Sequence, residues 1–175
     1  MLNTITVSIN KEHKLSISEL HLLEHCIIEK IEQFLKKQNI DGQGIILNAE
    51  TFIDSFYIEI IFYDNFLFDF IINNVLNVIS FSSRDVTLIA KHINVISSEV
   101  ANVDITSEEI SLYSPLKKLI GQSIEELYDF KIENSINYLI KVFNLVWEEK
   151  VISHTEGHIF KKSKLKEIAN FDNLI

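Results

Sequence analysis

The chain of 175 residues is poor in several residue types, and each scarcity excludes a class of protein. It has one Cys, one Pro, four Gly and one Arg, and 16 basic against 25 acidic side chains. The single cysteine, Cys26, cannot form an internal disulfide, and the N-terminus has no signal-peptide pattern, so we expect a cytoplasmic protein. With a net charge of −9 and Arg84 as its one arginine, the chain lacks the basic stripe of a nucleic-acid-binding protein.

Long apolar runs are also missing, because even residues 57–81 contain acidic side chains and several Asn. No window approaches the ~20 apolar residues of a membrane span. The few Pro and Gly and the lack of repeats predict a single domain over residues 1–175, with a polar tail at 148–175 that we assign to no element. Apolar residues make up 47% of the chain, and its mean hydropathy of +0.15 favours a second subunit that covers part of the surface.

Hydrophobic periodicity predicts an α+β fold, a mostly antiparallel sheet with helices packed on one face. Residues 4–9 alternate as a strand does, and the capping box Ser16 to Glu19 predicts a helix that ends near Lys37. The remaining predicted elements are one or two strands in 45–63, helices at 65–79, 83–100 and 123–130, and a strand at 136–147. The apolar face of the helix at 65–79 is expected to carry Phe66, Phe70, Val75 and Ile79.

One pattern on the first predicted helix carries chemistry: His21-Leu22-Leu23-Glu24-His25, of the form H-x-x-E-H. Residues four apart project from one helix face about 6 Å apart, so His21 and His25 can present two imidazoles to one ion. Neutral imidazoles suit zinc, and Glu24 beside them is placed to take a proton from an activated water. The alternative is that the two His and the Glu lie by chance on a solvated helix face. The apolar residues next to the motif disfavour this alternative.

A more distant acid is the candidate third ligand. Glu99 lies among apolar residues of the helix predicted at 83–100, and an acid near an apolar face needs a partner such as a metal. The alternative is an exposed glutamate near a helix end. His92 lies two turns earlier on the same face, where it could support the site or supply the fourth ligand of a closed, structural zinc site.

These residues resemble the insulinase/pitrilysin family of inverted zincins, which includes the mitochondrial processing peptidase. In that family a third ligand, a Glu, follows on a later helix, and Glu99 stands at a matching distance after His25. The family also carries an Asn-Ala-x-Thr run that leads into a strand, and this chain has Asn48-Ala49-Glu50-Thr51. An Ile120-Gly121 turn before a short helix extends the likeness over nearly the whole chain.

The resemblance implies a zinc metallopeptidase for short peptides, built on one insulinase-like domain. In that interpretation His21, His25 and Glu99 hold Zn²⁺ and Glu24 activates water. Asn48 and Ala49 line the substrate strand, and His92 stands where the family usually has a supporting acid.

Two departures from the family bear on partners. The family follows the zinc motif with a Phe-x-Gly-Thr turn, whereas residues 26–37 continue the helix pattern. Family enzymes also enclose the substrate between two related halves, the second of which supplies an Arg and a Tyr. These 175 residues contain no second half, which implies a homodimer or a heterodimer with a second insulinase-like subunit. The alternative function is a non-catalytic partner subunit of a larger metallopeptidase or peptide-binding complex.

Other candidates favour structural roles. His154 and His158 are spaced for a metal on a helix, but Gly157 favours a solvated loop. Cys26 among Leu and Ile is typical of the core rather than of a nucleophile. Residues 41–44 are typical of a turn because they lack the spacing and the Lys of a phosphate loop. The Phe-rich segment 62–70 favours core over a partner-binding patch.

Overall fold

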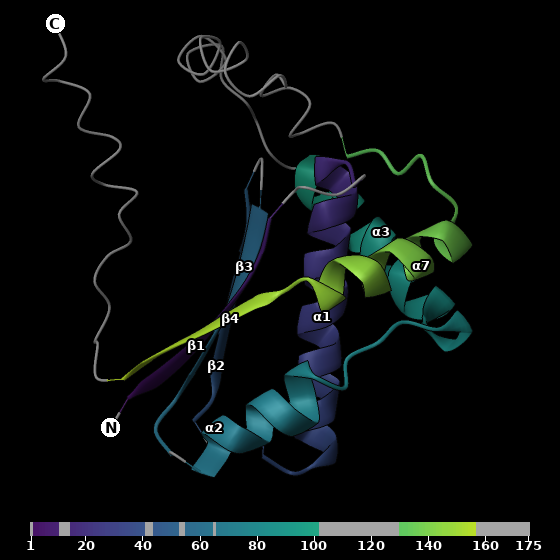
Figure 1. The fold of residues 1–175 in the computed structure, drawn as a ribbon. Helices are drawn as coiled ribbons and strands as arrows, with labels where there is room; N and C mark the ends of the chain where they lie inside the picture. Colours follow the sequence, from purple (N-terminus) through teal and green to yellow (C-terminus); the bar gives the residue numbers. More distant parts are fainter. Residues whose placement is uncertain are drawn as a thin grey trace, which may run out of the picture.

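The computed structural model describes residues 2–10, 15–40, 44–52, 55–64, 66–101 and 130–156. A four-stranded antiparallel sheet stands on one side of the domain and the helices on the other (Figure 1). The predicted α+β class, with helices on one face of the sheet, is confirmed. The short helix predicted at 123–130, the turn at residues 120–121, His158 and most of the 41–44 turn lie outside the described residues.

The strands are β1 (Asn3–Asn10), β2 (Ile46–Thr51), β3 (Ser55–Phe62) and β4 (Val151–Glu156), in the order β2-β3-β1-β4. β1 confirms the strand predicted at 4–9, and the segment 45–63 forms two strands. Ile5 lies opposite Ile60 and Val7 opposite Ile58, and all four side chains are buried. The other face of β1 carries Thr and Ser, so the alternation of the sequence places one face of the sheet against the helices.

Helix α1 (Ile17–Lys37) runs through the centre of the domain. Its N-terminus has the predicted capping box, because Ser16 accepts from the Glu19 backbone and Glu19 accepts from the Ser16 backbone. Two lysines in the last turn complement the helix dipole. Buried residues cover most of its circumference, including Leu20, Leu22, Leu23, Cys26 and Ile27. No helix of the described ranges has both the length and the apolar character to cross a membrane.

The helix predicted at 65–79 is shorter and less regular than expected. It consists of α2 (Phe66–Phe70) and a π-helix over Ile71–Leu76, where Asn77 donates its backbone N–H to the carbonyl of Ile72. The buried row is Leu67, Ile71 and Val75, spaced by four, while Phe66 is 77% exposed. The expected apolar face was therefore wrong for Phe66, because the helix begins one residue before its core-facing row.

Helix α3 (Val86–Ala101) confirms the helix predicted at 83–100. A 3-10 turn over Ser83–Asp85 precedes it and is capped by the Ser82 hydroxyl. The whole unit is tied to α1 by Lys30, whose ammonium lies 2.5 Å from the Asp85 carboxylate.

The strand predicted at 136–147 is wrong, because this segment forms α7 (Ile136–Glu148). Its β-branched and aromatic residues are typical of strands, but Leu139, Phe143 and Val146 recur at helical spacing and are buried. Ser135 caps the N-terminus by accepting from the Tyr138 backbone. Thirteen residues also exceed the usual length of a strand.

Residues that we expected in a polar tail and a solvated loop form β4 instead. β4 pairs with β1 and places His154 opposite Ile5 on the helix-facing side of the sheet. The His154 ring stacks 4.3 Å from the ring of Phe68, and its Nε2 lies 3.2 Å from the side-chain oxygen of Asn3. His154 is therefore a partly buried packing residue rather than part of a solvated loop.

Two leucines of α7 test its helical structure. Leu139 and Leu145 are six residues apart, so they would share one face of a strand, but in the helix Leu139 is 0% and Leu145 59% exposed. We expect Leu139→Ala to lower the free energy of unfolding by about 2–5 kcal/mol and Leu145→Ala by no more than about 0.5 kcal/mol. Urea unfolding of the two variants measures this difference, and equal losses would contradict the helix.

Candidate metal site

The two histidines of the H-x-x-E-H pattern lie on the first half of α1, where the helix is surrounded by core residues. Their Nε2 atoms are 3.1 Å apart, and their rings meet edge to face with centroids at 4.8 Å. Both rings are half-buried. Because buried leucines hold this part of α1 on both sides of the histidines, the helix fixes the position of the pair.

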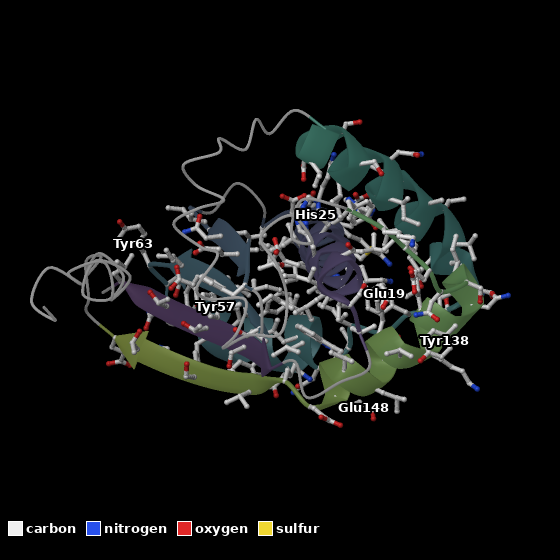
Figure 2. The ribbon with its side chains drawn as sticks, turned by 90° about the horizontal axis from the view of Figure 1, so that it is seen from above. Glu19, His25, Tyr57, Tyr63, Tyr138 and Glu148 are labelled. Carbon is white, nitrogen blue, oxygen red and sulfur yellow. The ribbon has the colours of Figure 1, made fainter. Side chains whose placement is uncertain are left out.

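Helix α3 brings the third group. An oxygen of Glu99 lies 3.5 Å from Nε2 of His25, and one donor atom from each of His21, His25 and Glu99 lies within 4.8 Å of the other two. In Figure 2, His25 on α1 lies beside α3. The structure thus brings together the three residues that the sequence predicted as metal ligands, although the side chain of Glu99 is 49% exposed.

This arrangement fits a small divalent cation. Two ligand atoms about 2.0–2.1 Å from a tetrahedral zinc ion lie about 3.3–3.4 Å apart. The two observed distances, 3.1 Å between the Nε2 atoms and 3.5 Å from Nε2 of His25 to Glu99, lie on either side of that value. The donor set of two imidazoles and one carboxylate is also one that zinc accepts. Among the described residues, the cluster contains no fourth His, Cys, Asp or Glu.

Burial keeps the two histidines neutral. It lowers the pKa of His21 to about 4, with a further contribution from the neighbouring His25. The pKa of His25 is also lowered, mainly by burial, while Glu99 acts in the opposite direction. Neutral imidazole is the form that binds a metal. Near neutral pH both rings are already in this form, so a metal need not displace a proton from them.

Glu24 lies on α1 between the histidines and is only 7% exposed. Burial raises its pKa to about 7, the negative charges of Glu99 and Glu50 add to the rise, and a hydrogen bond from the Thr51 hydroxyl opposes it. Thr51 is the last residue of β2, so the strand holds the carboxylate of Glu24 in place. Such a pKa near 7 is suited to proton transfer at neutral pH.

His92 lies behind the cluster and does not belong to it. Its ring centroid is 5.5 Å from that of His25, and its Nε2 lies 2.7 Å from a carboxylate oxygen of Glu29. Glu29 also pairs with Lys91 at 2.5 Å, and it lies one helical turn after His25 on the same row of α1. His92 thus packs beside the ring of His25, while its closest polar contact is with Glu29 rather than with a predicted ligand. A supporting role for His92 stays a prediction.

Sequence reasoning missed Glu29 and the contact of Thr51. The spacing of Glu29, four residues after His25, was a usable signal because it continues the row of His21 and His25. Thr51 was part of the Asn-Ala-x-Thr run, but nothing local to the sequence indicates that its hydroxyl reaches Glu24 across the interface between β2 and α1.

Asn48 and Ala49 lie on β2, which forms one edge of the described sheet. Asn48 is exposed and pairs with Glu59, while Ala49 is half-buried and pairs with Ile58, so their side chains point to opposite faces. Their place on an edge strand is compatible with a role in substrate binding. That role stays a prediction.

Cys26, directly after His25, is buried, and its pKa is raised to about 12, chiefly by burial. A thiol in that state supplies no thiolate near neutral pH. This agrees with a structural residue of the core. The Phe-rich segment is mixed, since Phe62 and Leu67 are buried whereas Phe66 is exposed.

No protein-family model matches the chain, and no curated protein matches it. The fold is similar to a crystal structure from Bordetella pertussis Tohama I named "putative zinc protease". The similarity covers 90% of this chain and 94% of that chain, with a TM-score of 0.59 and 7% sequence identity. At this identity the likeness shows a shared fold only.

The raised pKa of Glu24 predicts a pH-dependent stability of the metal-free protein. Its folded pKa of about 7 lies above the ordinary value of 4.5, so its protonated form favours folding below pH 4.5 and this contribution is lost as pH rises toward 7. With a chelator present, we expect the stability of Glu24→Gln relative to the parent to rise by about 2–3 kcal/mol between pH 5 and pH 8.5. Urea unfolding of both proteins measures the gain.

The exposed Glu32 on the same helix provides the matched control. Glu32→Gln should leave the pH dependence of the parent unchanged. A Glu24→Gln variant that follows the parent across the whole pH range would contradict the raised pKa.

Proposed function

We propose that this chain is a zinc-dependent peptidase of the insulinase type, in which His21, His25 and Glu99 hold Zn²⁺ and Glu24 accepts a proton from water. The observation that carries the proposal is the meeting of three donor atoms from α1 and α3 within 4.8 Å, directly beside a buried glutamate. The fold shared with the protein named "putative zinc protease" supports it.

A bound zinc ion would polarise a carbonyl and lower the pKa of a bound water. The protein's own side chains would hold the ion and take up the proton of that water. Glu24 is held by Thr51 and lies next in sequence to His25, so its carboxylate can receive a proton at the centre of the site. Burial raises the pKa of Glu24 most, and the nearby acids Glu99 and Glu50 add to the rise. Together with Glu24 these acids provide the negative charge that a divalent cation would neutralise.

The proposed substrates are short peptides. β2 lies at the edge of the described sheet, and a peptide could pair with its free backbone groups while Asn48 offers an exposed amide. The Arg and Tyr functions that the family takes from a second half would come from a second subunit, either another copy of this chain or a related chain.

Two alternatives remain as outcomes of experiment. A non-catalytic partner subunit would need none of the metal-binding geometry. A closed, structural zinc site would need a fourth protein ligand. His92 is the candidate, but its contact with Glu29 disfavours His92 as a zinc ligand.

Metal analysis tests the site directly. We expect about one zinc per chain after reconstitution, and loss of that zinc from His21→Ala and Glu99→Gln, because each removes one of three donors. Glu133→Gln, at an exposed acid paired with Lys131 far along the sequence, is the control and should retain zinc. A parent protein that binds no zinc under these conditions would overturn the proposal.

The role of Glu24 requires a separate measurement. We expect Glu24→Gln to retain zinc and to lose about 10²–10⁴-fold in turnover of a mixture of fluorogenic short peptides, because the amide cannot take up the proton. Glu32→Gln should match the parent. Cleavage by Glu24→Gln at the rate of the parent would exclude a general-base role, even if the metal site is real.

A further inference from the structure

A concave surface, away from the candidate metal site, lies toward the C-terminal end of α1. This groove has a volume of about 570 Å³ and is formed by the last two turns of α1 and by the segment 78–84 that leads into α3. Gln33 and Lys37 line it, and they continue the row of His21, His25 and Glu29 along the helix. Lys30 is the first residue of α1 that lines the groove, and at 1.5 Å per residue it lies about 7.5 Å along the helix axis beyond His25.

The groove gathers positive charge in an acidic chain. Lys30, Lys37 and Arg84 line it, although the chain as a whole carries a net charge of −9. Lys30 is already paired, because its ammonium lies 2.5 Å from Asp85 and 4.9 Å from the centre of the Phe81 ring. Lys37 and Arg84 are exposed, and neither side chain is paired with an acid within the ranges that the structure covers.

The position of the single arginine adds chemical detail. A guanidinium presents a planar fork of donors that matches a carboxylate or a phosphate with two parallel hydrogen bonds. The hydroxyl of Ser80 lines the same groove and can hydrogen-bond to the same anion. The amide nitrogen of Gln33 donates one hydrogen bond to Glu29 at 2.9 Å, and its second N–H can serve the anion as well.

The remaining lining residues are apolar. Phe34, Val78 and Ile79 form this part of the groove, and Val78 is 53% exposed. The ring of Phe34 is supported by Phe70, whose centroid is 6.2 Å away. One exposed and two half-buried apolar side chains beside two unpaired cations are complementary to a ligand that carries both an apolar body and a negative charge.

We infer that this groove binds a carboxylate attached to an apolar body. The volume lies within the range of small-ligand sites, which is roughly 300–1,000 Å³. The ligand is either a free organic acid or the C-terminus of a peptide that ends in an apolar residue, because both present the same chemistry. The inference does not depend on the metal site, since none of the predicted metal ligands lines the groove.

Matched pairs of probes test the inference on the full chain. The first pair is 3-phenylpropanoate and its neutral amide, and the second is an acetylated tripeptide ending in Phe with either a free carboxylate or an amide. We expect the acid of at least one pair to bind about tenfold more tightly than its amide, measured by NMR chemical-shift titration. A preference in the first pair alone identifies a small acid, and a preference that is larger in the second pair identifies a peptide C-terminus.

Two variants locate the charge. Arg84→Gln and Lys37→Gln should each reduce the preference for the acid, and the double variant should abolish it. Lys36→Gln is the control, because Lys36 is also exposed in the last turn of α1 but does not line the groove. The inference is overturned if neither acid binds more tightly than its amide, or if the preference survives in the double variant. All three residues are exposed, so Arg84→Gln should leave thermal unfolding unchanged, and Lys36→Gln and Lys37→Gln should each cost no more than a small and similar loss from the helix dipole.

Discussion

The burial of α1 is the constraint on which the rest of the structure depends. A helix surrounded by the sheet, α3 and other core elements cannot rotate about its axis without exposing apolar residues to water. The polar groups His21, Glu24 and His25 are therefore presented in fixed directions, two of them toward α3 and one toward β2. The packing of α1 thus stabilises a polar cluster in which the acids Glu24, Glu50 and Glu99 repel one another.

The relation between α1 and α3 is set by charge as well as by packing. Asp85 in the 3-10 turn before α3, and His92 and Glu99 on α3, follow one another along the chain. They meet Lys30, Glu29 and His25 of α1 in turn. The two partly buried contacts at Lys30 and Glu29 fix the direction of α3, so that Glu99, near its end, arrives at the histidines. The position of the half-exposed carboxylate of Glu99 is in this way determined by pairs that lie about two and about four helical turns before it.

The sequence correctly predicted those features that depend on one local pattern. The capping box at Ser16, the alternation in β1 and the H-x-x-E-H spacing are each readable within a few residues, and all three are present in the structure. α7 was misjudged because β-branched composition outweighed the spacing of its buried residues. The contacts of Thr51 with Glu24 and of Glu29 with His92 depend on how separate elements pack, so no local pattern encodes them.

The pairing of β4 with β1 has a consequence for how the molecule reaches its native state. The register sets Ser8 against Val151, so the strand at one margin of the sheet can be added only after almost all of the described chain has been synthesised. Closing so long a loop costs entropy before any contact repays it, which slows folding. Until then, the backbone groups along one side of β1 remain open to pairing with other chains during biosynthesis.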